Sequence, residues 1–329
     1  MRCRTAPPWL IAVVLILGGG HWAHGLLAVQ RGTDRAALET IQIRPNVYVI
    51  FGAGSNVAVH VGEDGVILVD SGSAAMADRL LDAVKAITGA PIRMIINTSA
   101  DADHAGGNET VGRAGTTMMN RADLFSAEDT ATVLAHENVL RRMSDNESLF
   151  PAGRWPTVTY TQRIKSMYLN DDAVRVMRHL GAHSDGDSMV LFRRADVIVT
   201  GDILDLRSFP VIDPEKGGSI QGEIEALNQL LELTVPAEPL ATKPGRTLLV
   251  PGHGRVSDFG ELVEYRDMVT IIRNIIQDMI DKGMTLEQVK AANPTQGHRR
   301  AYGTDSGPWT TDMFVAAIYN DLKNHTGKP

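Results

Sequence analysis

The order of β-branched and amphipathic segments predicts an α/β fold with two β-sheets and helices packed outside them. Short apolar strands come first, a helix and another strand follow, and a long loop leads to further strands and helices. The 329 residues, of which 43% are hydrophobic and 22% charged, are enough to bury a substantial core. No repeat, low-complexity tract or long linker divides the sequence after residue 25.

The first elements are expected to be strands joined by tight turns. Their β-branched runs are separated by Gly- and Asn-containing turns, which is typical of consecutive antiparallel strands. Apolar residues then recur at helical spacing from Ala75 to Ile87 and predict a helix over residues 74–88. A second helix is expected over residues 127–143. The strands expected here are residues 47–51, 56–61, 65–70 and 92–97.

The second half is expected to contain further strands and several helices. A long helix is expected to begin after Asp258, whose pattern with Glu261 resembles a capping box, and to end at Gly283. Thr285 and Gln288 repeat this pattern before a short helix. Two more helices are expected at residues 220–233 and 311–322, and strands at residues 157–160, 166–169, 173–180, 188–192, 197–200 and 247–250.

Residues 1–25 have the layout of a cleavable secretory signal. Arg2 and Arg4 precede the apolar stretch WLIAVVLILGGG, and Ala23-His24-Gly25 then offers small residues for cleavage. The alternative is an uncleaved membrane anchor, but the apolar stretch is shorter than the about 20 residues that a spanning helix needs. We therefore expect a periplasmic or secreted protein that begins near residue 26.

The charge and the cysteine content limit which classes of partner and of metal ligand are expected. The chain has 32 basic and 39 acidic residues, a net charge of −7, and no blocks of Lys or Arg. This balance argues against nucleic acid, or a membrane surface beyond export itself, as a partner. The partner that we expect is a small-molecule substrate. The only cysteine, Cys3, lies within the expected signal. The exported chain would therefore form no disulfide and offer no thiolate ligand.

Candidate ligand side chains lie at the ends of several expected strands. Asp70 lies in ILVDSG, Asp202 ends VIVTGD and His253 lies in LLVPGHG. The loop NTSADADHAGGN, residues 97–108, follows another strand, and His183 lies in a turn just before one. A lone Asp at a strand end more often caps a turn. Five such places together favour one shared metal centre, because rigid strands fix side chains that loops expose.

In their order, these motifs resemble the metallo-β-lactamase superfamily. The family loop reads His-x-His-x-Asp-His, and Ser99-x-Asp101-x-Asp103-His104 occupies that frame here. The resemblance spans roughly residues 40–260 and implies a four-layer αββα sandwich of two mixed β-sheets. It further implies one domain over residues 26–329, with a C-terminal helical extension from about residue 258.

The resemblance also implies a metal site with two half-sites. The residues that differ from the family's ligands all fall in one of them. One half-site would take Asp103, His104 and His253, with Asp202 as a bridging carboxylate, and all four match. The other would take Ser99, Asp101 and His183, and only His183 matches. Asp70 matches the family's aspartate that orients the metal loop. We expect one firmly bound zinc ion and a weak or absent second ion, with iron or manganese as alternatives.

The resemblance implies a metal-dependent hydrolase, and the expected signal at residues 1–25 makes it a secreted one. In such enzymes metal-activated water attacks a lactam, ester, thioester or phosphoester, because the metal brings the pKa of water toward neutrality. Asp103 and Asp101 are the candidate catalytic bases, and Ser99 is expected to position the water. The alternative is a non-hydrolytic metal- or ligand-binding protein with a degenerate second metal site. The segments 126–155 and 208–222 are expected to wall the pocket.

Overall fold

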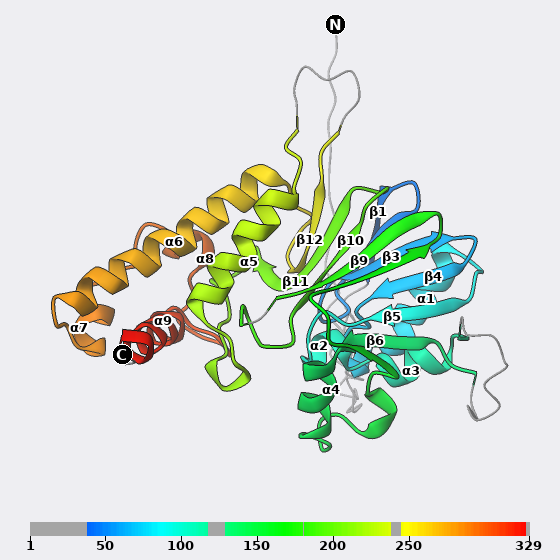
Figure 1. Ribbon diagram of the computed structural model, residues 1–329, viewed down its shortest axis with the longest axis horizontal. Helices are drawn as coiled ribbons and strands as arrows, with labels where there is room; N and C mark the ends of the chain where they lie inside the picture. The colour runs from blue at the N-terminus through cyan, green and yellow to red at the C-terminus, as the bar shows by residue number, and fades with distance from the viewer. Residues whose placement is uncertain (1–37, 118–128, 180, 238–244, 327–329) are drawn as a thin grey trace, which may run out of the picture. The chain divides into compact units, whose positions relative to one another are not determined.

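The computed structural model describes residues 38–117, 129–179, 181–237 and 245–326 (Figure 1). These residues form a 7-stranded and a 5-stranded β-sheet with helices outside them, which confirms the predicted fold class. The expected secretory signal and Cys3 lie outside the described residues. Within the described ranges, no helix has both the length and the apolar character needed to cross a membrane.

The 7-stranded sheet holds its strands in chain order. Strands β1 to β4 pair antiparallel, and β4 to β7 pair parallel. Parallel pairing sets Val69 of β4 opposite Ile96 of β5, so Asp70 and Asn97 leave the sheet at the same end. The strands are β1 (Glu39–Arg44), β2 (Val47–Phe51), β3 (Val57–Gly62), β4 (Gly65–Val69), β5 (Ile92–Ile96), β6 (Thr132–His136) and β7 (Val158–Tyr160).

The 5-stranded sheet has the order β12-β11-β10-β9-β8. Only β11 and β12 pair parallel in it, and Gly201 lies opposite Pro251. Asp202 and His253, which follow along these two strands, are therefore carried to the same end of this sheet. The strands are β8 (Ile164–Leu169), β9 (Asp172–Arg178), β10 (Ser188–Phe192), β11 (Val197–Asp205) and β12 (Leu248–His253).

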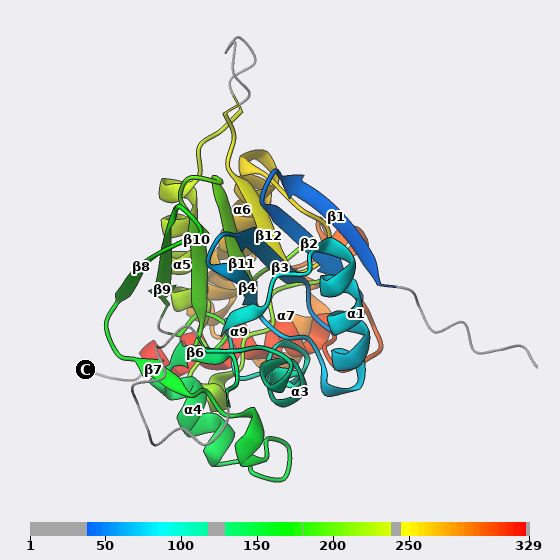
Figure 2. The ribbon, with the colours of Figure 1, turned by 90° about the vertical axis from the view of Figure 1, so that its right-hand side faces the viewer.

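Helices cover the outer face of each sheet, and the two inner faces pack together (Figures 1 and 2). Leu80 of α1 belongs to one buried cluster with residues of the 7-stranded sheet. A second cluster joins Val69 and Val190 from the two inner faces, and a third joins α5, α6 and α9 to the 5-stranded sheet. The helices are α1 (Ala77–Ile87), α2 (Ala102–Ala105), α3 (Asn108–Arg113), α4 (Glu137–Ser144), α5 (Ile220–Leu233), α6 (Phe259–Asp281), α7 (Leu286–Ala291), α8 (Arg299–Tyr302) and α9 (Thr311–Thr326).

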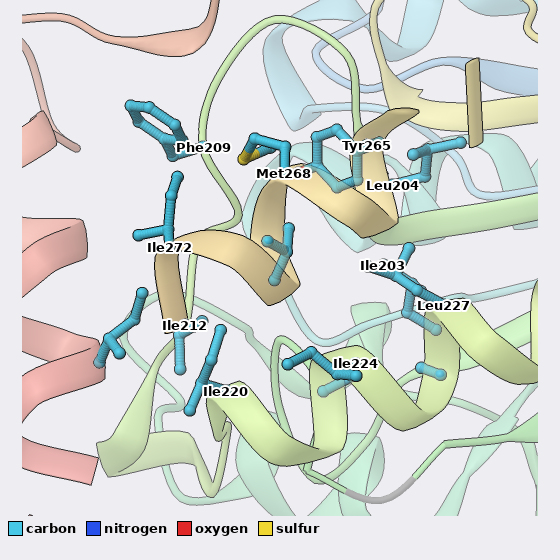
Figure 3. Close-up of a cluster of buried hydrophobic side chains, with 14 of the residues drawn as sticks. Ile203, Leu204, Phe209, Ile212, Ile220, Ile224, Leu227, Tyr265, Met268 and Ile272 are labelled. Atoms are coloured by element: carbon cyan, nitrogen blue, oxygen red, sulfur yellow. The ribbon is translucent and has the colours of Figure 1, made fainter. Parts of the chain in front are cut away.

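Helices α5 and α6 pack against β11 through apolar side chains at helical spacing. Ile224 and Leu227 of α5 and Met268 and Ile272 of α6 lie in one buried cluster (Figure 3). Leu204 of β11 belongs to the same cluster and is fully buried. Because burial of each large apolar side chain stabilises the fold by about 1.5–3 kcal/mol, this cluster fixes the strand that carries the site residue Asp202.

The helix expected over residues 127–143 is wrong in its first part. Residues 132–136 form β6, a parallel strand between β5 and β7, and α4 begins only at Glu137. The run TVLAH is largely buried, and a short buried apolar run cannot be told from a helix by its periodicity. Strand β1 was not expected. In its sequence ETIQIR only Ile41 and Ile43 are large and apolar, and most of the strand is exposed.

Of the two capping boxes expected in the C-terminal part, the one before α7 forms completely and the one before α6 forms only in part. Thr285 and Gln288 make a complete capping box before α7. Asp258 caps α6 by accepting from backbone N–H groups. The Glu261 carboxylate, however, accepts from Ser257 Oγ at 2.9 Å rather than from the cap backbone.

Candidate metal centre

The loop after β5 is fixed by the buried carboxylate of Asp70. Asp70 Oδ1 accepts the Thr98 N–H at 2.8 Å, and Oδ2 accepts from Thr98 Oγ1 at 2.7 Å. Oδ2 also lies 2.8 Å from Nδ1 of His104. The Ser188 N–H donates to Thr98 O at 2.8 Å and ties the loop to the other sheet. A single carboxylate at a strand end thus sets both the path of the loop and the orientation of the His104 ring.

Asp103, His104 and His253 converge on one point. Asp103 and His104 lie on α2 and His253 ends β12, and one ligand atom from each lies within 4.8 Å of the others. His253 Nε2 lies 3.2 Å from Asp103 Oδ2. Ligand atoms of a tetrahedral zinc ion with bonds of about 2.0–2.1 Å lie about 3.3 Å apart. Two imidazoles and one carboxylate at this spacing can hold zinc, and also iron or manganese.

Asp202 lies between two groups of candidate ligands. Its Oδ1 lies 3.1 Å from His104 Nε2 and 3.5 Å from His253 Nε2. Asp202 also groups with Asp101 and His183, with ligand atoms within 4.8 Å of one another. This is the place that the sequence resemblance implies for a bridging carboxylate.

Asp202 and His104 are tightly packed, and the charges around them outweigh the effect of burial on their pKa values. A Cβ atom at Gly252 would lie 2.2 Å from Asp202 Oδ1, so only glycine lets β12 pass this close. Burial by itself raises the pKa of Asp202, but the nearby His104 ring reverses the shift and lowers it. Burial lowers the pKa of His104, yet Asp202 and Asp70 raise it well above its usual value. Asp202 is therefore held as an anion, the form that binds a cation, whereas His104 must release a proton before it can bind one.

The second group of candidate ligands consists of Asp101, His183 and Asp202. Lys216, which the sequence did not single out, contacts this group. Asp101 Oδ2 lies 2.8 Å from His183 Nε2, and Asp101 Oδ1 lies 2.8 Å from Lys216 Nζ. His183 Nδ1 lies 2.7 Å from Val211 O and donates to it, since a carbonyl only accepts. Ser99 Oγ donates to Asp101 Oδ2 at 3.2 Å. Both oxygens of Asp101 are therefore engaged by the chain itself.

The contacts of Asp101 also determine its protonation. Burial raises the pKa of this carboxyl, but hydrogen bonds and charge from His183 and Lys216 hold it well below its usual range. The pKa of Lys216 is raised, because Asp101 and Asp213 outweigh the effect of burial. The pair is thus a carboxylate and an ammonium at neutral pH. A carboxylate with so low a pKa is a weak proton acceptor.

Two buried acids lie near the His183 turn. Asp187 accepts from the Ser184 N–H at 2.7 Å and from Ser184 Oγ at 2.6 Å. Burial raises the pKa of Asp187 to about 6. Burial also raises the pKa of Glu223 on α5, whose carboxyl oxygens have no hydrogen-bond partner among the described residues. Burial therefore shifts both groups toward the neutral, protonated form.

The structure brings every predicted site residue into one region. The residues are Asp70, Ser99, Asp101, Asp103, His104, His183, Asp202 and His253. Of the two expected walls, residues 208–222 border the site through Val211 and Lys216. In the other expected wall, residues 126–155, Arg142 of α4 pairs at 2.7 Å with Asp185, which lies close to the His183 turn. Residues 126–128 of this wall lie outside the described ranges. Lys216 is 115 positions from Asp101, so no local pattern connects the two.

Comparisons with known proteins agree with the fold of the chain. The family model of the metallo-beta-lactamase superfamily matches residues 50–253. A double mutant of the sec-alkyl sulfatase PisA1 is similar in structure, with a TM-score of 0.62, 16% identity and coverage of 89% of this chain and 51% of that one. A metallo-beta-lactamase from Pontibacter korlensis has a TM-score of 0.53 and 18% identity, with coverage of 71% and 99%.

The chain spans about half the length of the alkylsulfatases that it matches. The second of these, the stereoselective inverting sec-alkylsulfatase Pisa1 from Pseudomonas sp., has a TM-score of 0.61 at 15% identity. It covers 89% of this chain, and this chain covers 52% of it. A search of curated protein sequences finds no match.

Proposed function

Since the chain belongs to the metallo-beta-lactamase superfamily, we propose that it is a metal-dependent hydrolase with one firmly held ion. The observation that carries the proposal is the convergence of Asp103, His104 and His253 on one point. The proposed ion is zinc, and iron or manganese fits the same donors. Asp202 would be the fourth group beside it.

When bound, such an ion lowers the pKa of water toward neutrality and polarises the bond to be cleaved. The chain's own residues orient the metal ligands and accept the proton. Asp70 holds His104 through Nδ1 and leaves Nε2 directed at the centre. The Asp103 side chain is 41% exposed, more than those of Asp101 and Asp202, and so it is the carboxylate most open to water. On this accessibility we assign to Asp103 the acceptance of a proton from attacking water.

The substrate class that we propose is a small-molecule ester, with an alkyl sulfate as the first candidate. The alkylsulfatases overlap this chain over 89% of its length, whereas the Pontibacter metallo-beta-lactamase overlaps it over 71%. Lactams, lactones, thioesters and phosphoesters remain in the set to be tested, because one fold hosts many reactions.

The test is a substrate panel with metal-loaded protein. Purified chain is loaded with zinc, manganese or iron and assayed against alkyl sulfates, lactams, lactones, thioesters and phosphoesters. We expect hydrolysis of at least one class, abolished in His253→Ala and retained in His298→Ala, which removes a histidine outside the site. A chain that binds metal at the centre but hydrolyses nothing would support the alternative, a non-hydrolytic binding protein. The engaged carboxylate of Asp101 is the observation that favours this alternative.

We also propose that the protein is exported to the periplasm or beyond the cell. The support is the Arg–apolar–small pattern of residues 1–25. Sequencing the amino terminus of protein from the exported fraction is expected to give a start near residue 26. Full-length protein in the membrane fraction would instead show an anchor.

A further inference from the structure

Lys216 is fixed in the structure by its own backbone. It ends the 3-10 turn Pro214–Lys216, which Asp213 caps by accepting the Lys216 N–H at 3.2 Å. The Asp185 N–H donates to Lys216 O at 2.8 Å, next to the His183 turn. Gly217 follows with a φ of 80°, a left-handed conformation that glycine adopts without strain. The base of the Lys216 side chain is therefore anchored beside the altered half-site.

The Lys216 ammonium lies where the altered half-site needs a positive charge. Nζ is 2.8 Å from Asp101 Oδ1 and 3.3 Å from Asp213 Oδ2. The Asp101 side chain is only 19% exposed, so its charge is poorly neutralised by water. Its second oxygen is engaged by His183 Nε2. Among the described residues, Lys216 and His183 together pair both oxygens of this carboxylate.

A metal ion would compete directly with Lys216 for this position. The ligands open to it are Asp101, His183 and the shared Asp202, because Ser99 offers only a neutral hydroxyl, a poor zinc ligand. An ion bound to Asp101 would lie within ion-pair distance of the ammonium. Like charges this close repel strongly in a partly buried site.

We propose that Lys216 takes the place of the second metal ion. Its ammonium neutralises Asp101 and keeps other cations out of the half-site formed by Asp101 and His183. Lys216 is thus a positioning residue that holds Asp101, and through it His183, beside Asp202. This inference rests on the proposed function, because it concerns the half-site next to the firmly held ion.

The test is a zinc titration of the full chain and of variants at Lys216. Lys216→Met keeps the unbranched side chain and removes the charge, and Lys216→Arg is the matched control that keeps it. We expect one strong site in the wild-type protein and in Lys216→Arg. In Lys216→Met we expect a second zinc ion to bind at least tenfold more tightly than any second ion in the wild-type protein. Equal second-site affinity in all three proteins would overturn the proposal.

A second measurement needs no variant. Crystals of the wild-type protein grown with excess zinc are examined by anomalous diffraction at the zinc edge. We expect one peak, among Asp103, His104 and His253. A further peak in contact with Asp101 and His183 would overturn the role of Lys216 and leave the hydrolase proposal standing. The lack of any peak would overturn both.

Discussion

The carboxylate of Asp70 lies 2.8 Å from Nδ1 of His104, and both side chains are buried. Because Nδ1 is occupied by this contact, the other ring nitrogen, Nε2, faces Asp202 at 3.1 Å. The direction of a candidate metal ligand is thus set by a residue at the end of a different strand. Such outer contacts are typical of histidine ligands, whose tautomer and ring orientation they fix.

We predict that Asp70→Asn weakens metal binding without removing a ligand. Asparagine can accept only through one oxygen, so it cannot serve Thr98 and His104 together as Asp70 does. Loss of such an orienting partner typically lowers metal affinity by about 10–100-fold. Zinc affinity measured by competition with a chelator checks this. The exposed substitution Asp78→Asn is the control, and an equal affinity in both variants would contradict the prediction.

Substitutions of the two loop carboxylates are expected to have unequal effects on hydrolysis. Asp103→Asn should remove nearly all activity, because Asp103 is both a candidate ligand and the solvent-open carboxylate. Asp101→Asn should lower kcat/KM less than tenfold and keep the low-pH limb of its profile, because both Asp101 oxygens are engaged and its pKa is held low. Steady-state kinetics from pH 4 to 9 would decide. A hundredfold loss with a flattened low-pH limb in Asp101→Asn would make Asp101 the general base instead.

Restoring the two histidines of the family loop should raise the affinity for a second ion. The double variant Ser99→His with Asp101→His supplies imidazoles, which bind zinc well and are neutral when they do so. We expect the gain to be larger when Lys216→Met is added, because the ammonium no longer has the Asp101 carboxylate as partner. Zinc titration of the double and triple variants measures this. A single bound ion in both would show that this loop is wrongly matched to the family motif.

The contribution of Asp187 to the stability of the protein is expected to fall as the pH rises from about 4 to about 6. Its pKa is about 6 in the folded protein, against 3.8 for an unperturbed aspartate, so the folded state binds the proton more tightly. This contribution is fully present below the unfolded pKa and is lost as pH rises through the folded pKa, up to about 3 kcal/mol. Urea unfolding at several pH values checks it. Asp187→Asn should lack this part of the slope, and identical slopes in both proteins would contradict the assignment.

The sequence predicted the elements whose pattern is local. Helix α5 has the predicted bounds, Ile220–Leu233, because its apolar face repeats over 14 residues and Ser219 caps it. The first strands were equally clear, since turns separate β2, β3 and β4. Strand β6 was mistaken for part of a helix because only its neighbours β5 and β7 make it a strand. The edge strand β1 is mostly exposed, and its two isoleucines, Ile41 and Ile43, gave only a short apolar alternation.

The residues of the site also divide into those that local sequence predicted and one that it did not. Asp70, His104, Asp202 and His253 were found because each lies at the end of an apolar strand or in a loop that follows one. Lys216 was missed, although its segment was expected to border the pocket. Its ammonium reaches Asp101 only through the turn that Asp213 and Gly217 form, and no feature of the surrounding sequence predicts such a contact. The partner of a charged residue is a tertiary property.

The central claim is that Asp103, His104 and His253 hold one metal ion, and zinc content per chain tests it most directly. Elemental analysis after gentle purification is expected to give close to one zinc ion per wild-type chain. Ser99→Ala should keep that value, since Ser99 lies in the other half-site, whereas His253→Ala should reduce it to nearly zero. Two tightly held ions in the wild-type chain, or a metal content that His253→Ala leaves unchanged, would contradict the account.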